Sequence, residues 1–137
     1  MGIGLKSGPD FSGGGRYQHP QAWIDHVIET DPALWNVELS YPPRYSGRLN
    51  SCGMATLEEP GVPGCTSIGR ASLVSRRELL DTIIHEETHH RLWQRAHAGS
   101  VIAWNKIAAP ALEEAYVEEV TYRFLRLQGY LKSVGKK

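Results

Sequence analysis

Hydrophobic side chains recur with helical spacing in three stretches of the chain. After Pro20, apolar residues fall on one face of a short helix, and proline is well tolerated in a first turn. A second helix is predicted from Ser75 to about His97, because Ser75 and Glu78 have the spacing of a capping box and Gly99 supplies a stop. A third helix should open at Pro110, run through about Gln128 and stop at Gly129.

Between the first two helices the pattern is typical of short strands. Val37, Leu39 and Tyr41 alternate with polar residues, which predicts a strand that ends at Pro42 and Pro43. Residues 49–57 and 65–74 are further strand candidates on either side of the turn-forming EEPGVPG. The pattern therefore predicts an α+β protein with a small antiparallel sheet or hairpin.

Length and charge narrow the class of protein. The chain has 137 residues, the usual size of one domain. Fifteen Lys and Arg balance fifteen Asp and Glu, so no field of one sign argues for nucleic acid or an anionic membrane as partner. No apolar run approaches the roughly 20 residues of a membrane span. Residues 1–19 are predicted to be a flexible Gly-rich leader, residues 20–131 the folded domain and residues 132–137 a frayed tail.

Two cysteines, Cys52 and Cys65, flank a Gly- and Pro-rich segment. They would close a small loop by a disulfide in an oxidising compartment, or remain two separate thiols. Neither cysteine has the close Cys or His spacing of a zinc knuckle.

The second predicted helix contains His85-Glu86-Glu87-Thr88-His89, which matches the H-E-x-x-H pattern. Residues four apart lie about 40° apart around a helix, so both imidazoles can reach one cation with Glu86 beside them. Zn²⁺ favours imidazole nitrogen and, in catalytic sites, takes three protein ligands and a water whose pKa falls to about 7. The motif predicts His85 and His89 as zinc ligands and Glu86 as the base that takes a proton from the attacking water.

A third ligand must come from elsewhere, and the last predicted helix is rich in glutamate at its start. Its solvent side is marked by Glu119 and two arginines, which leaves Glu113 and Glu114 near the buried side. A carboxylate turned toward a core needs a partner, which a metal would supply. The alternative is a solvated acidic helix start favoured by the helix dipole.

HEETH followed by Glu114-Ala115-Tyr116-Val117-Glu118 resembles the gluzincin arrangement of thermolysin-like metallopeptidases. The resemblance implies that Glu114 is the third zinc ligand and that Glu118 orients a histidine, with Glu113 and Glu118 as rival ligands. Glu118 stands where the family has Asp, and the resemblance covers two short segments only. It implies a zincin-like fold, in which two long helices carry the metal site and pack on the sheet, and an edge strand from residues 49–74 that holds an extended peptide.

Ile3-Gly4-Leu5 resembles the end of the D-P-x-G-L motif that closes the core of Rhs-repeat proteins, although the Asp-Pro is absent here. In that family the chain beyond the motif is a toxin domain. The resemblance implies a polymorphic toxin attached to a parent Rhs protein, delivered into a target cell by a bacterial secretion system, commonly type VI. It also implies a cognate immunity protein.

The sequence thus predicts a zinc metallopeptidase acting on a protein or peptide, used as a secreted antibacterial effector. Three alternatives stay open: a zinc hydrolase for another amide or ester, a cytosolic regulatory peptidase resembling the phage-repressor-cleaving family, and a non-catalytic interaction domain. Metal content separates the interaction domain from the enzymes, because an interaction domain should hold little zinc or a closed site with four protein ligands.

Overall fold

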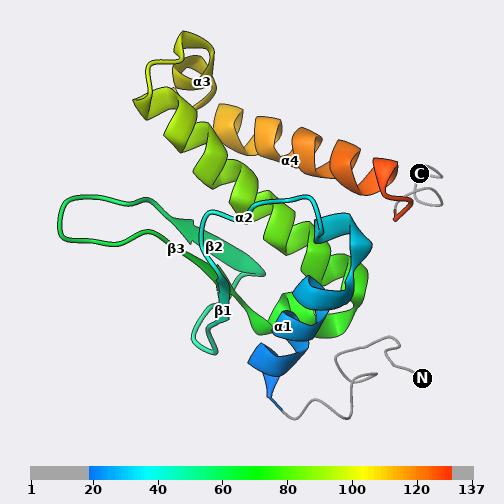
Figure 1. Ribbon diagram of the computed structural model, residues 1–137. Coiled ribbons are helices and arrows are strands. Elements are labelled where there is room, and N and C mark those ends of the chain that lie inside the picture. Colours follow the sequence, from blue (N-terminus) through cyan, green and yellow to red (C-terminus); the bar gives the residue numbers. More distant parts are fainter. Residues whose placement is uncertain (1–18, 131–137) are drawn as a thin grey trace.

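The computed structural model describes residues 19–130, and one long helix runs through the middle of them (Figure 1). The predicted tail, and all of the predicted leader except His19, lie outside the described residues. A small sheet lies on one side of the central helix and the last helix on the other. The protein is therefore α+β, as the sequence predicts.

The helices are α1 (Pro20–Thr30), α2 (Arg76–His97), α3 (Val101–Lys106) and α4 (Pro110–Leu127), with short 3-10 helices at Pro32–Leu34 and Arg70–Val74. The Ser75 side chain accepts the Glu78 N–H at 3.0 Å, which caps α2 as predicted. Gly99 and Gly129, just beyond α2 and α4, have φ of 108° and 87°. That left-handed conformation favours glycine, which explains both helix ends. The short helix α3 was not predicted.

The sheet has the order β1-β3-β2, with β1 at Pro43–Tyr45, β2 at Gly53–Thr56 and β3 at Cys65–Ile68. The β2–β3 hairpin is antiparallel as predicted, but β1 pairs with β3 in parallel, so the prediction of an antiparallel sheet is wrong. The connection between β1 and β2 explains the mixed pairing. At its start the Ser46 N–H donates to the Ile68 carbonyl, and at its end the Cys52 carbonyl accepts from the Gly69 N–H. Both ends of the connection therefore lie at the same end of β3. The chain leaves β1 there and enters β2 there, so β2 runs in the direction opposite to β1 and β3.

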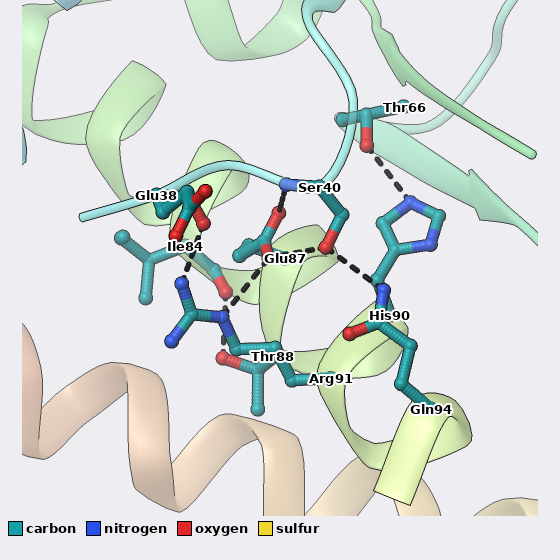
Figure 2. Close-up of polar contacts among 9 residues, drawn as sticks. All are labelled: Glu38, Ser40, Thr66, Ile84, Glu87, Thr88, His90, Arg91 and Gln94. Atoms are coloured by element: carbon teal, nitrogen blue, oxygen red, sulfur yellow. Dashed lines mark hydrogen bonds and ion pairs between the residues drawn. The ribbon is translucent and has the colours of Figure 1, made fainter. Parts of the chain in front are cut away.

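The predicted strand at residues 37–41 does not form. Side chains of α2 bind the backbone there in place of a neighbouring strand: the Ser40 N–H donates to Glu87 at 2.8 Å, and Arg91 donates to the Glu38 carbonyl at 2.6 Å (Figure 2). The apolar and polar residues alternate here because Val37 and Leu39 pack on the core although the segment is not a strand. The strand begins only at Pro43, an edge position that a residue without an N–H can occupy.

The core lies on both sides of α2, and it has two parts. The larger cluster joins α1, β3, α4 and the first half of α2; its largest fully buried side chains are Trp23, Ile24, Ile68, Leu73, Leu79, Leu80, Ile83 and Leu125. A smaller cluster of Leu92, Ala96 and Ala103 fixes the second half of α2 against α3. Burial of each Leu or Ile stabilises the fold by about 1.5–3 kcal/mol, so α2 is held firmly along its length. No described helix combines the length and apolarity needed to cross a bilayer.

Cys52 and Cys65 are free, exposed thiols. Cys52 lies opposite Gly69 and Cys65 opposite Thr56, at the two ends of the β2–β3 ladder. The two cysteines are therefore four residue steps apart along the ladder, which is about 13 Å. A disulfide needs Cα atoms within about 7 Å, so this fold does not allow the loop-closing bridge.

Candidate metal centre

Two helices bring the predicted ligands together. His85 and His89 lie one turn apart on α2, and both direct Nε2 at the carboxylate of Glu114 on α4: the distances are 2.9 Å from His85 and 3.3 Å from His89. One ligand atom from each of these three side chains lies within 4.8 Å of the others. The structure therefore assembles a group that could hold a metal ion.

Glu113, which neighbours Glu114, contacts the other nitrogen of His89. Its Oε2 lies 2.6 Å from His89 Nδ1, and both side chains are mostly buried, with 15% and 13% exposed. An Nδ1–H that donates to this carboxylate leaves Nε2 as the free lone pair, facing Glu114. A carboxylate behind a ligating histidine fixes the ring and makes it more basic.

Glu118, for which the gluzincin resemblance implies this orienting role, lies elsewhere. It is exposed, and its charge adds to the raised pKa of Asp81, which burial mainly causes. The helices run in opposite directions, so a turn further along α4 corresponds to a turn earlier along α2. Glu118 therefore lies beside an earlier part of α2 than Glu114 does, and it is Glu113 that contacts His89 Nδ1.

Glu86 lies beside the two histidines and is buried, with 7% of its surface exposed. Burial raises the pKa of its carboxyl; the charges of His85 and His89 and a hydrogen bond from the Ala55 backbone N–H lower it. A desolvated carboxylate with few donors is a stronger proton acceptor than one in water.

The strand β2 lies directly over this carboxylate. A Cβ placed on Gly53 would collide with the methyl group of Thr82 and lie 3.1 Å from Glu86 Oε2, so only glycine allows this approach. Sequence reasoning missed Gly53 and Ala55, although a glycine within a predicted strand is a known signal of close backbone contact. The strand is at the edge of the sheet, and its free side faces the histidines.

A cavity of about 270 Å³ holds the site; its lining comprises Gly53, Met54, Ala55, His85, Glu86, His89, Trp93 and Glu114. It shares Gly53, His85, Glu86 and Glu114 with a cavity of about 340 Å³ toward the start of α2. It shares Trp93 with a cavity of about 570 Å³ toward the end of α2. The His/Glu group therefore lies in the middle of a groove between α2 and the β2–β3 hairpin.

The other polar residues of the motif region hold the fold. Glu87 accepts hydrogen bonds from Ser40 and Arg91, while Thr88 donates to the Ile84 carbonyl at 2.7 Å (Figure 2). His90 Nε2 contacts Thr66 Oγ1 at 2.9 Å and the Cys65 carbonyl at 3.1 Å, so it joins α2 to β3. Burial lowers the pKa of His90, which favours the neutral ring that these contacts use.

The donor set suits zinc. Two imidazole nitrogens and one carboxylate oxygen from three side chains are a ligand set found in catalytic zinc sites, and a fourth position is left for water or substrate. Comparison with protein-family models, with curated proteins and with solved structures found no match to this chain. The argument for function therefore rests on the site itself.

Proposed function

We propose that this protein is a zinc-dependent metallopeptidase of zincin-like architecture. His85, His89 and Glu114 would hold the ion, and Glu86 would act as the general base. The observation that carries the proposal is the convergence of three ligand atoms within 4.8 Å beside a buried glutamate. Chance rarely produces a helical H-E-x-x-H that also meets a glutamate from another helix.

The chemistry divides between the ion and the side chains. When bound, zinc supplies Lewis-acid activation of a water and of the substrate carbonyl. Glu86 takes a proton from the attacking water and delivers it to the amide nitrogen, so that the C–N bond breaks and an amine leaves. The raised pKa of this buried carboxyl fits both steps, because the group must accept and then release a proton. Glu113 keeps the His89 ring oriented throughout.

The edge strand supports a peptide as the substrate. The Ala55 N–H donates to Glu86 and the Gly53 carbonyl accepts from the Ser51 hydroxyl, so the backbone polar groups of residues 53 and 55 point away from β3. An extended chain can add to such an edge and lie across the His/Glu group. The groove continues on both sides of the site, as an endopeptidase would need.

Metal stoichiometry measured together with peptide cleavage tests the proposal. The wild type should bind one zinc per chain and cleave peptides, and Glu86→Gln should keep the zinc and lose cleavage. Alanine at His85, His89 or Glu114 should lower zinc content, whereas Glu118→Ala should keep it. Unchanged zinc in the Glu114→Ala variant, or full cleavage by Glu86→Gln, would refute these roles. A wild type that binds no zinc would favour an interaction domain.

We further propose that the peptidase serves as an antibacterial effector of the Rhs type. The support is the Ile3-Gly4-Leu5 resemblance, which lies outside the described residues. Expression in the bacterial cytoplasm and, separately, in the periplasm should slow growth in at least one compartment, and Glu86→Gln should abolish the effect. Harmless expression of the wild type in both compartments would argue against an effector.

A further inference from the structure

Beyond the metal centre, a cavity of about 570 Å³ lies between the second half of α2 and the β2–β3 hairpin. Trp93 forms a wall shared with the metal-site cavity, and its ring centroid lies 5.7 Å from that of His89. A peptide lying across the His/Glu group therefore passes the mouth of this cavity. A side chain close to the bond being cut can enter it.

Aromatic rings form one wall. The Tyr41 ring lies 4.8 Å from that of His90, which in turn lies 5.8 Å from the ring of Trp93. This wall is fixed because His90 is buried and hydrogen-bonded to β3. Flat aromatic faces attract an alkyl chain by dispersion and a cation through the ring quadrupole.

Carboxylates form an acidic wall next to the aromatic one. Glu58 and Glu59 are exposed and line the cavity, and no Lys or Arg is among its described lining residues. The Tyr41 hydroxyl donates to Glu58 at 2.9 Å, which ties this carboxylate to the aromatic wall. The cavity is thus negatively charged at neutral pH, and its charge is complementary to a cation.

A tight turn holds these carboxylates in place. Glu59 and Val62 exchange two backbone hydrogen bonds of 2.9 and 2.8 Å across Pro60 and Gly61, and Gly61 has φ of 80°. Proline followed by a glycine at positive φ is the pattern of a type II turn. The acidic wall is therefore part of an ordered hairpin.

We propose that this cavity binds the side chain of a Lys or Arg next to, or close to, the scissile bond, so that the substrates are polypeptides with a basic residue there. This inference rests on the proposed peptidase function, because it assumes that a peptide bond is cut at the His/Glu group. A long alkyl stem lies along Trp93 and Tyr41, while the charged end reaches Glu58 and Glu59. A Glu or Asp side chain is repelled, and an uncharged side chain gains only the apolar contact.

The test begins with the zinc-loaded full chain and a mixture of random peptides, whose cleavage sites are mapped by mass spectrometry. Lys and Arg should be enriched at one fixed position near the cut. Matched peptides with Lys or Met at that position should then differ about tenfold in kcat/KM, the size expected when the charged end pairs with two partly exposed carboxylates while both side chains make the same apolar contact. The double variant Glu58→Gln/Glu59→Gln should reduce this ratio to about one.

A matched double variant, Glu29→Gln/Glu119→Gln, removes two exposed carboxylates outside the cavity and should leave the ratio unchanged. Glu58→Lys/Glu59→Lys should reverse the preference toward a Glu-containing peptide. Cleavage with no preference for a basic residue, or a preference that survives Glu58→Gln/Glu59→Gln, would overturn the cavity assignment while leaving the peptidase intact.

Calorimetry on zinc-loaded Glu86→Gln separates the two proposals. The Lys peptide should bind about tenfold more tightly than the Met peptide, and the preference should vanish when Glu58 and Glu59 are also changed to Gln. That result in a protein whose wild type cleaves nothing would support the cavity and refute the peptidase. Equal binding of both peptides would refute the cavity.

Discussion

The two adjacent glutamates of HEETH should respond to substitution in opposite ways. Glu87 is almost fully buried and accepts hydrogen bonds from the Ser40 N–H at 2.8 Å, the Ser40 hydroxyl at 2.7 Å and Arg91 Nε at 3.0 Å. These bonds fasten residues 38–40 to α2, where the sheet does not reach. Glu86 instead faces the metal site and is a desolvated carboxylate with a raised pKa.

The magnitude for Glu87→Ala follows from these contacts. Two hydrogen bonds to a charged acceptor contribute about 1.5 kcal/mol each, at the low end of their range because Ser40 is only half buried and water can reach it. Arg91 is about half exposed, so its ion pair adds less than about 1 kcal/mol. The expected loss of unfolding free energy is about 3 kcal/mol, or roughly 12 °C in Tm for a domain of this size.

Urea and thermal unfolding of the metal-free proteins measure this loss. Glu87→Gln keeps one acceptor oxygen and should lose about half as much, while Glu86→Gln should not destabilise the metal-free protein, because it removes a buried charge. Zinc stoichiometry should be unchanged in all three variants. A loss below about 0.5 kcal/mol in Glu87→Ala, or zinc loss at unchanged stability, would refute the structural role of Glu87.

Three further predictions concern other contacts. Gly53→Ala should push β2 away from α2 and lower kcat about 10- to 100-fold, as measured by peptide cleavage, because misplacement by about 1 Å is enough. Glu113→Gln should weaken zinc affinity about 10- to 100-fold in a competition titration with a chelator, since His89 loses its charged partner. Burial, and then the hydrogen bond to Asp31, raise the pKa of Tyr130. Its contribution to stability is therefore complete below about pH 10, the usual tyrosine pKa, and is lost as the pH rises further; Tyr130→Phe should flatten this alkaline loss in unfolding titrations.

Each of these predictions has a matched control. Gly47→Ala adds a methyl group that meets only Tyr45, at an ordinary 3.4 Å, and should keep kcat. Glu119→Gln changes an exposed glutamate on the same helix as Glu113 and should keep zinc affinity. Tyr122→Phe removes an exposed hydroxyl and should keep the wild-type alkaline profile. If a control changes as much as its test variant, the effect does not come from the contact named.

Local patterns in the sequence determine the two long helices and half of the site. A cap at Ser75, a proline at the start of α4 and glycines at 99 and 129 act within one turn of the chain, so they can be read without knowing the fold. The one-turn spacing of His85 and His89 is equally local. These features predicted α2, α4 and the two imidazoles on one face.

Contacts between distant segments decided the rest. Whether Glu113, Glu114 or Glu118 meets a histidine depends on how α4 is aligned along α2, which side-chain packing sets and local spacing does not. Residues 37–41 alternate like a strand, yet Glu87 and Arg91, some fifty positions later, bind their backbone. The place of β2 over Glu86 likewise depends on Gly53 approaching Thr82. The sequence alone determined which residues lie on each of the two long helices. The tertiary structure decided which of them meet across the groove, because that alignment comes from packing between elements far apart in the chain.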